Sequence, residues 1–317
     1  MSVAEVTSRA PVAAGDESRV MVVIPCRNEA ASIAKVVADF RAALPRAEIL
    51  VVDNASTDDT AEIARQAGAM VVSEPRPGKG FALLSGFRAA READYVVMVD
   101  GDDTYPAEDV EKLLAAAEAG ADMVIGTRLA DAEEGAFRAG HSFGNKLFNL
   151  LVRLLFGVRT EDLFSGYRVL TRRFLSTAPL IARGFEVEAE LSLQAAAQNF
   201  RTAEVPIRYR ARPRESASKL NTYKDGTRIF LAILTFFRDY RPLTFFGVLA
   251  LFLLILSLAG GSVVIAEFLT TGLVPRLPLA VLSAALFILS ALSFTCGVLL
   301  SSINRRAAEL AALIPWR

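Results

Sequence analysis

The chain of 317 residues has few of the residues that most often carry chemistry, with two cysteines, one histidine and one tryptophan. Cys26, Cys296 and His141 together fall short of the four ligands of a structural zinc site. No G-x-S-x-G motif is present, so a serine-hydrolase triad is not expected. An excess of charge is also lacking, with 35 basic and 35 acidic residues. This balance removes the basic field on which nucleic-acid binding depends, and no nucleic-acid partner is expected.

Two stretches lack charge altogether. No charged residue occurs between Arg241 and Glu267, and none occurs between Arg276 and Arg305. Each stretch is long enough to cross a hydrocarbon layer of about 30 Å as a helix. We therefore expect two transmembrane helices within residues 242–304 and an integral protein of the inner or plasma membrane. The alternative is a pair of buried helices in a soluble core, which seldom run so long without charge.

Basic residues flank one end of this region. They are Lys219, Lys224, Arg228, Arg238 and Arg241 before the first span, and Arg305 and Arg306 after the second. Positively charged flanks stay in the cytosol, so both termini and everything before residue 242 are expected there. Residues 1–18 are predicted to be a disordered tail without a signal peptide, and residues 305–317 a cytosolic tail.

Strand-like and helical patterns alternate over the first part of the chain. Runs rich in β-branched residues occupy 19–26, 48–53, 69–74, 95–100 and 122–126, and helical patterns occupy 30–44, 57–67, 79–93 and 106–119. This alternation predicts an α/β domain, a mainly parallel sheet covered by helices, over residues 19–223. Ligands of such sheets bind beyond the carboxyl ends of the strands. The polar clusters PCRNE, DNASTDD and DGDD end three of these strands and are expected to face one crevice.

Two further segments are amphipathic but too short to span a membrane. Residues 141–157 and 224–241 carry apolar side chains at helical spacing. We expect both to be helices that lie in the membrane interface, the second as a juxtamembrane helix. Ordinary core helices are the alternative, because amphipathicity does not separate the two.

The sequence YVVMVDGDDTYP places three aspartates after a buried strand. Such close carboxylates are tolerated when a divalent cation neutralises them, and Mg²⁺ takes one or two carboxylates together with the phosphate oxygens of a substrate. Asp100 and Asp102 are the expected metal ligands. In the alternative interpretation, Asp103 or Thr104 simply caps the helix that follows.

The other clusters offer polar groups at neighbouring strand ends. Asp53 can accept a hydrogen bond from a ribose or a base, and Asn28 and Glu29 add polar groups beyond Pro25. In EPRPGKGFALLSG the glycines allow a ligand to approach the backbone, and Lys79 adds a positive charge near a helix start. Turns and helix caps are the alternative for each cluster. The spacing of a Walker A loop is absent.

In their order along the chain, PCRNE, DNASTDDT, GKG and DGDD resemble the GT-A fold of glycosyltransferase family 2. The later segments GTR, FRAGHSFGNKLFN, EDLFSGYRVLTRR, FEVEAEL, EVPIRYRAR and SASKLN are similar to the polyprenyl-phosphate branch, which includes dolichyl-phosphate mannose and glucose synthases. The resemblance covers residues 20 to about 240. It implies an inverting transfer of a hexose from a UDP- or GDP-linked donor to a polyprenyl phosphate, with Mg²⁺ or Mn²⁺ as cofactor.

The resemblance also implies roles for matching residues. The donor-binding residues would be Pro25, Asn28, Glu29, Asp53, Lys79, Arg212 and Lys219. Asp100 and Asp102 would hold the metal on the diphosphate, and Arg128, Arg138 and Ser142 would hold the lipid phosphate. Relatives often carry a glutamine as a further metal ligand where this chain has Thr104, which puts the metal geometry in question.

The chemistry agrees with these roles. A phosphate monoester has a second pKa of about 6 and is already anionic at neutral pH, so its attack needs no general base. The protein must instead hold two negative groups together, with a metal for the leaving diphosphate and arginines for the attacking phosphate. The glutamates Glu186, Glu188 and Glu190 would contact sugar hydroxyls or simply start a helix.

Two other functions compete with this one. A processive polysaccharide synthase would carry a Q-x-x-R-W motif, whereas the one tryptophan here is Trp316, beyond the second span. A non-catalytic membrane scaffold would have lost the metal carboxylates, whereas Asp100 and Asp102 are present. The sequence leaves open the sugar, the base and whether the chain forms a homo-oligomer.

Overall fold

The computed structural model describes residues 18–132, 139–157, 160–178, 180, 182–184, 186–210 and 222–313. The chain divides into two compact units. The first unit consists of residues 1–146 and 160–220, and the second of residues 147–159 and 221–317.

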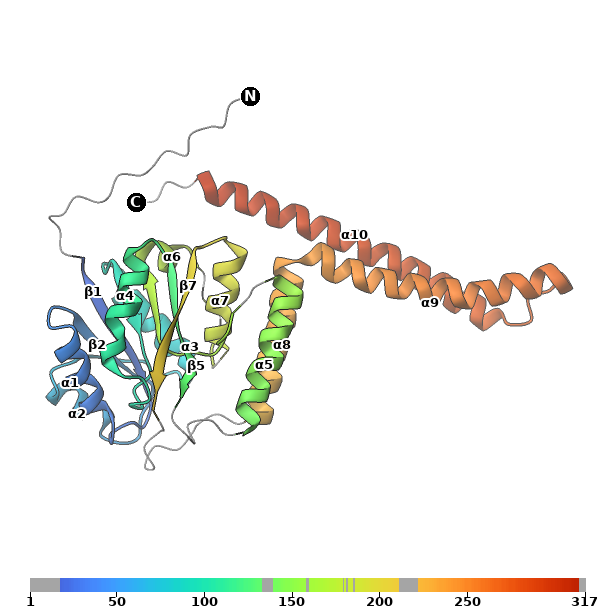
Figure 1. Ribbon diagram of the computed structural model, residues 1–317. Helices are drawn as coiled ribbons and strands as arrows, with labels where there is room; N and C mark the ends of the chain where they lie inside the picture. The colour runs from blue at the N-terminus through green and yellow to red at the C-terminus, as the bar shows by residue number, and fades with distance from the viewer. Residues whose placement is uncertain are drawn as a thin grey trace, which may run out of the picture. The chain divides into compact units, whose positions relative to one another are not determined.

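A sheet of seven strands forms the centre of the first unit, in the order β3-β2-β1-β4-β6-β5-β7 (Figure 1). The strands are β1 (Val20–Cys26), β2 (Glu48–Asp53), β3 (Met70–Ser73), β4 (Tyr95–Met98), β5 (Met123–Ala132), β6 (Arg168–Thr171) and β7 (Thr202–Tyr209). Strand β6 runs antiparallel to β4 and β5, and the other pairs are parallel. The predicted α/β fold with a mainly parallel sheet is therefore confirmed, although β6 and β7 were not expected.

Helices cover both faces of the sheet. They are α1 (Ile33–Ala43), α2 (Thr60–Gln66), α3 (Lys79–Ala89), η1 (Ala107–Asp109), α4 (Val110–Glu118), α6 (Arg172–Thr177) and α7 (Val187–Ala197). Alternate residues of β1 face opposite sides: Val22 and Ile24 join an apolar core with α1 and α4, whereas Met21 and Val23 join a second core with α3 and α7. Burial on both faces explains why the strands read as continuous apolar runs.

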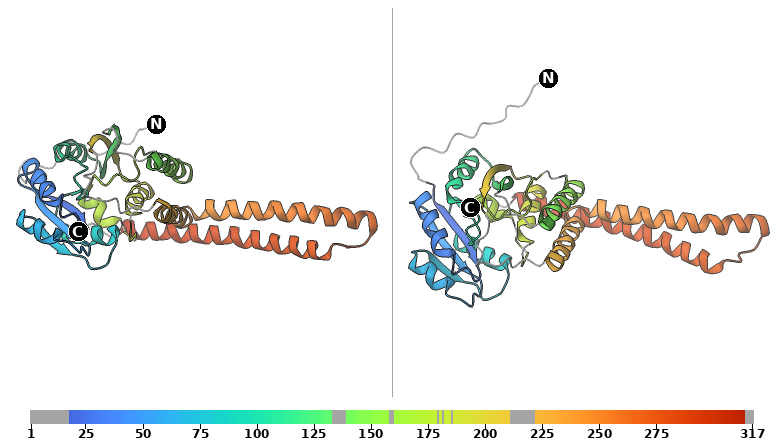
Figure 2. Two further views of the ribbon diagram at one scale, coloured as in Figure 1. Left: turned by 90° about the horizontal axis from the view of Figure 1, so that it is seen from below. Right: turned by 60° about the horizontal axis from the view of Figure 1, so that its bottom comes forward.

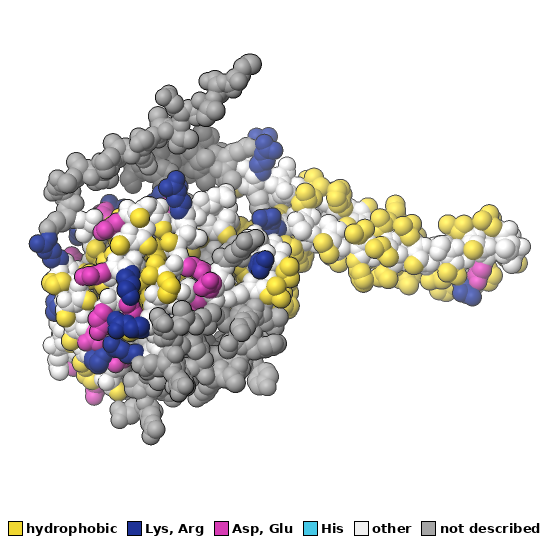
Figure 3. Space-filling model, in the orientation of Figure 1, with side chains coloured by type: hydrophobic (Ala, Val, Ile, Leu, Met, Phe, Trp, Pro, Cys, Tyr) yellow, Lys and Arg dark blue, Asp and Glu magenta, His cyan; other side chains and the backbone are white. Residues whose placement is uncertain are grey.

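The second unit holds two long apolar helices, α9 (Pro242–Thr271) and α10 (Leu277–Leu313). Both are long enough and apolar enough to cross a membrane, by length and composition. They run antiparallel as a hairpin, which Figure 2 shows in two views. Serine side chains bridge them: Ser257 donates to the Ser283 carbonyl at 2.8 Å and Ser290 to the Ala250 carbonyl at 2.7 Å. Their outward side chains are hydrophobic, as the yellow surface in Figure 3 shows.

Two amphipathic helices precede the hairpin, α5 (Ala139–Phe156) and α8 (Thr222–Tyr240). Phe156 contacts Phe237 edge to face, with ring centroids 6.0 Å apart, so each helix buries part of its apolar face against the other. On α5, Leu150 and Leu154 remain exposed, with 50% and 71% of their surface accessible. Exposed leucines on an otherwise packed helix are consistent with the predicted interfacial position, which remains a prediction.

Candidate active site

The loops after β1 and β2 are joined at the carboxyl edge of the sheet. Cys26 pairs with Asp53 in the ladder, two residues before Asn28. The backbone N–H of Asn28 donates to Ser56 Oγ at 3.0 Å, and its Oδ1 accepts from the Thr57 N–H at 2.7 Å. Asn28 has φ of +52°, a left-handed conformation that asparagine tolerates better than most residues. The predicted donor residue Asn28 therefore also fixes the shape of this edge.

Asp53 lies at the end of β2 with 8% of its surface exposed. Its Oδ1 is buried and has no hydrogen-bond partner among the described residues. A buried acceptor without a partner is costly, so a hydroxyl or N–H of a ligand is the natural complement. This observation fits the predicted role of Asp53 toward a nucleoside.

The neighbouring Asn54 was not singled out from the sequence, yet it shapes the loop between β3 and α3. Its Nδ2 donates to the Arg76 carbonyl at 2.7 Å, and its Oδ1 accepts from the Gly78 N–H at 2.7 Å. The same loop is tightened by Glu74, whose carboxylate binds the Arg76 guanidinium at 2.7 Å and accepts from Ser85 Oγ at 2.6 Å. These hydrogen bonds, the one from Arg76 foremost, lower the pKa of Glu74 to about 2.

The aspartates after β4 separate into different environments. Asp102 is buried and accepts a hydrogen bond from Thr104 Oγ1 at 2.6 Å. Asp103 binds Lys35 at 2.7 Å and Arg210 at 3.4 Å, so it serves as an ion-pair partner of the fold. The threonine in place of the usual glutamine therefore orients Asp102. Among the described residues, no group of three or more metal-ligating side chains gathers at one point.

Lys79 lies between two carboxylates. Its Nζ is 2.5 Å from Asp100 Oδ1 and 2.5 Å from Glu188 Oε1. Burial disfavours the charged lysine, but the attraction of the two carboxylates outweighs this and raises the pKa of Lys79 above its ordinary value. Burial raises the pKa of Glu188, against the attraction of Lys79. The sequence analysis expected Asp100 to face the crevice and Lys79 to lie near a helix start as a donor-binding residue, but it did not indicate that the two touch.

The glycines beside Lys79 make room for the chain itself. A Cβ on Gly78 or Gly80 would collide with the backbone carbonyls of Arg183 and Ala182, and the Gly80 N–H donates to the Arg183 carbonyl at 3.2 Å. The segment before α7 occupies the space beside these glycines, so their lack of a side chain first serves the packing of the chain itself. The approach of a ligand to their backbone stays a prediction.

The three glutamates of FEVEAEL diverge. Glu186 accepts from the Gly184 N–H at 3.0 Å and Glu190 from the Ala182 N–H at 2.7 Å, so both hold the segment before α7. Glu188 alone of the three turns to Lys79. The divergence follows from the helical course of α7, which starts at Val187.

Arg128 is held by the buried carboxylate of Asp162, a residue that the sequence analysis did not single out. Asp162 is fully buried and binds Nε and Nη2 of Arg128 at 2.6 and 2.7 Å. This fork is the strongest geometry for an arginine and a carboxylate. The segment EDLFSGYR, in which Asp162 lies, contained the signal, since an acid beside a buried turn requires a partner. The fork occupies one edge of the guanidinium and fixes its direction.

The same segment supplies Gly166 and Arg168. A Cβ on Gly166 would lie 2.8 Å from Asp100 Cγ, so this glycine leaves space for the aspartate. Arg168 is fully buried and donates to the carbonyls of Leu163 and Ser165 at 2.7 and 2.9 Å. Burial lowers the pKa of Arg168 to about 10. These contacts hold the turn against the end of β4.

Four predicted site residues lie wholly or partly outside the description. Arg138, Arg212 and Lys219 are outside the described residues, and Ser142 lies in α5 with its side chain undescribed. The others come from the same edge of the sheet: Pro25, Asn28, Glu29, Asp53, Lys79, Asp100, Asp102 and Arg128.

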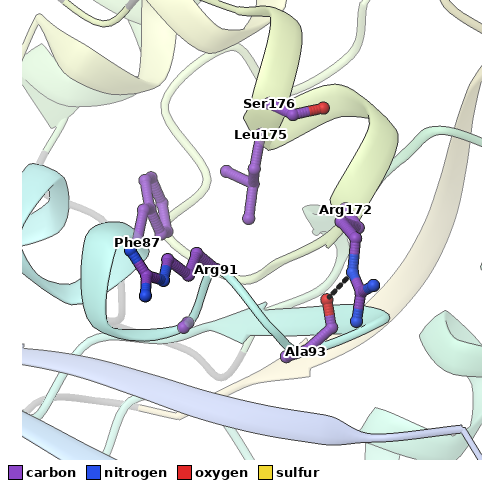
Figure 4. Close-up of a pocket in the computed structure, with 7 residues that line it drawn as sticks. Phe87, Arg91, Ala93, Arg172, Leu175 and Ser176 are labelled. Carbon is purple, nitrogen blue, oxygen red and sulfur yellow. Dashed lines mark hydrogen bonds between the residues drawn. The ribbon is translucent and has the colours of Figure 1, made fainter. Parts of the chain in front are cut away.

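A shallow pocket lies at the other end of the sheet, where α3 ends and α6 begins. Phe87, Leu175 and Arg172 line it, and Arg172 Nε donates to the Ala93 carbonyl at 3.2 Å (Figure 4). Ala93 precedes β4, whereas Asp100 follows it, so the pocket is separate from the strand-end site. It contains no carboxylate among its lining residues.

Comparison with known proteins agrees with the fold and the strand-end motifs. Residues 21–177 match the family described as Glycosyl transferase family 2. The chain is 38% identical over 228 residues to Glycosyltransferase AglJ of Haloferax volcanii, covering 72% of this chain and 75% of that protein. It is 35% identical over 209 residues to Dolichyl-phosphate hexose transferase of the same organism, covering 66% and 89%.

A similar solved structure is glucosyl-3-phosphoglycerate synthase from Mycobacterium tuberculosis in complex with Mn²⁺ and uridine-diphosphate-glucose. It is 26% identical, has a TM-score of 0.56, and covers 68% of this chain and 78% of that chain. The expected resemblance to glycosyltransferases is thus confirmed in both sequence and fold. The chain belongs to glycosyl transferase family 2.

Proposed function

We propose that this protein transfers a hexose from a UDP- or GDP-linked donor to a polyprenyl phosphate, with inversion at the sugar carbon. The observation that carries the proposal is the combination, in one chain, of a strand-end acid site and two helices able to cross a membrane. The likeness to a relative named Dolichyl-phosphate hexose transferase supports the same conclusion.

The donor would bind at the edge formed by β1, β2 and β4. The unpartnered Oδ1 of Asp53 fits a nucleoside hydroxyl or base. Asp100 and Asp102 fit a metal that also takes phosphate oxygens, because Mg²⁺ needs only one or two protein carboxylates. The likeness to a glycosyltransferase bound to Mn²⁺ and uridine-diphosphate-glucose supports a divalent metal here, either Mg²⁺ or Mn²⁺. The metal, when bound, would neutralise the charge that develops on the leaving diphosphate.

The acceptor would be held by arginines. A lipid phosphate carries its own negative charge, so it needs orientation rather than deprotonation. Arg128, directed by the Asp162 fork, is one such group, and Arg138 and Ser142 complete the proposed phosphate site. With the phosphate and the diphosphate both restrained, the attacking oxygen approaches the sugar carbon opposite the leaving group.

The distribution of charge supports one membrane orientation. Arg241 precedes α9 and Arg305 lies near the end of α10, and the side chain of Asn304 donates to the Asp239 carbonyl, so these residues share one end of the hairpin. The other end carries a Glu267–Arg276 ion pair at 2.9 Å. Basic residues at the shared end favour a cytosolic location for it, and for the catalytic unit.

Purified full-length protein in nanodiscs tests this proposal. It is incubated with UDP- and GDP-hexoses, undecaprenyl phosphate and Mn²⁺, and released nucleotide diphosphate is measured. One donor should release nucleotide only when the lipid phosphate is present, and Asp102→Asn should abolish the release. Lack of turnover with every donor would favour the scaffold alternative, and a long polymeric product would favour a processive synthase.

A further inference from the structure

Lys79 forms an ion pair with Asp100, one of the two carboxylates that the proposed metal would bind. Its Nζ is 2.5 Å from Oδ1 of Asp100, the first aspartate of the D-x-D pair. A divalent ion binds carboxylate oxygens at about 2.0–2.6 Å, depending on the metal. An ammonium and a metal ion on one carboxylate repel each other at such short distances. Metal binding to Asp100 is therefore weakened as long as Lys79 stays on its Oδ1.

Glu188 holds Lys79 in this position. Its Oε1 is 2.5 Å from Nζ, and its side chain is 4% exposed. The Oε2 of Glu188 is buried without a hydrogen-bond partner among the described residues. A buried carboxylate in this state needs a cation nearby, so Lys79 is anchored at one side by a charge that cannot move into water.

The turn at Gly166 packs against one side of the Asp100 carboxylate. A Cβ on Gly166 would be 3.0 Å from Asp100 Oδ1 and 2.8 Å from its Cγ, which shows how closely the turn abuts the carboxylate. Lys79 itself is held at the start of α3, where the Gly80 N–H is bonded to the Arg183 carbonyl. The lysine has the longer and more flexible side chain, so we take it, rather than the aspartate, as the part that moves.

The charges around Lys79 indicate the direction in which its ammonium group would move. Two acidic side chains, Asp100 and Glu188, share the one cation Lys79, and Asp102 follows two residues after Asp100. A divalent cation at Asp100 and Asp102 would offset part of this acidic charge, and the diphosphate of the donor would then add negative charge beside the metal. An ammonium displaced from Asp100 can follow that charge while it remains near Glu188.

We propose that Lys79 is a built-in competitor of the metal: Glu188 keeps it on Asp100 until the donor diphosphate draws it away, so that metal binding depends on the donor. Lys79 and Glu188 are positioning residues in this account. The inference rests on the proposed metal and donor site. It predicts that the enzyme without nucleotide takes up free metal weakly.

The test is a titration of the full-length protein with Mn²⁺, in which the spectrum of free Mn²⁺ is followed by electron paramagnetic resonance with and without UDP. Wild type should bind Mn²⁺ much more tightly with UDP. Lys79→Met should bind Mn²⁺ alone at least about tenfold more tightly than wild type, and the gain from UDP should shrink. Lys35→Met is the matched control, since Lys35 binds the adjacent Asp103. It should change the affinity by less than about threefold, as expected for an exposed pair.

A second variant covers misfolding, because Lys79→Met strands the buried charge of Glu188. The double variant Lys79→Met/Glu188→Gln removes both charges and should show the same gain. The inference is overturned if the folded double variant binds Mn²⁺ alone with the affinity of wild type. It is also overturned if wild type binds Mn²⁺ equally tightly with and without UDP. Either result leaves the proposed metal site intact. Absence of Mn²⁺ binding under every condition refutes the proposed metal site itself, and with it this inference.

Discussion

Gly166→Ala is the most informative single substitution, because it adds one methyl group against one functional carboxylate. The new Cβ would lie closest to Asp100 Oδ2, and 2.8 Å from Asp100 Cγ. Ordinary contacts of this kind begin near 3.4 Å, so the carboxylate must shift by more than about 0.6 Å. Gly166 is not among the positive-φ glycines, so alanine brings no backbone strain.

The expected result is a loss of catalysis with a modest loss of stability. A misplacement of a reacting or positioning group by about 1 Å can cost about a hundredfold in rate, so turnover should fall by about ten- to a hundredfold. Overpacking typically destabilises by about 1–3 kcal/mol, and the low end applies because Asp100 is partly exposed. Donor-dependent nucleotide release gives the rate, and a thermal melt in detergent gives the stability.

Gly226→Ala is the control, since nothing lies within 4 Å of the Cβ it would add. It should retain the wild-type rate. Full activity in a folded Gly166→Ala variant would refute the placement of Asp100 at the reacting centre. A loss of activity accompanied by a large fall in the melting midpoint would instead assign Gly166 to the fold.

Four other substitutions probe separate parts of the account. Asp102→Asn should lower turnover by at least about a hundredfold and weaken Mn²⁺-dependent donor binding in calorimetry; wild-type activity that survives a chelator would contradict this. The hydrogen bond from Arg76 lowers the pKa of Glu74 from 4.5 to about 2. The ion pair between these residues therefore stabilises the folded protein fully above pH 4.5, and this stabilisation is lost as the pH falls through 2. Glu74→Gln should therefore lower the melting midpoint at pH 7 and not at pH 2, and equal differences would refute the assignment. Cysteine at Gly272, which lies between α9 and α10, should react with an impermeant maleimide in intact cells, whereas protection would reverse the orientation. Arg138→Ala should raise the apparent KM for polyprenyl phosphate about ten- to a hundredfold with donor affinity kept; equal loss of both would move Arg138 to the diphosphate.

The positions of Asp53 and Asp100 could be predicted from the sequence for two reasons. The runs of β-branched residues identify the strands, and parallel strands end at the same edge of the sheet. Strand β6 was missed because it spans only Arg168–Thr171 and enters the sheet antiparallel. Its four residues carry no periodic signal long enough to separate a strand from a loop.

The contacts of the site were less predictable than its location. The Lys79–Glu188 and Arg128–Asp162 pairs join residues far apart in the chain, and spacing does not report such pairing. The glycine at position 80 correctly indicated a close approach, but not that the approaching backbone would be that of Ala182. Residue types thus predicted the kind of contact, and the fold determined the partner.

The identity of the product decides whether the sugar moves to a lipid phosphate. Full-length protein in nanodiscs is given its donor and Mn²⁺ together with polyprenyl phosphate, polyprenol or 3-phosphoglycerate, and the products are identified by mass spectrometry. We expect a sugar linked through phosphate to the polyprenyl chain, with no product from polyprenol. Transfer to 3-phosphoglycerate instead, the compound that appears in the name of the similar solved synthase, would contradict this expectation.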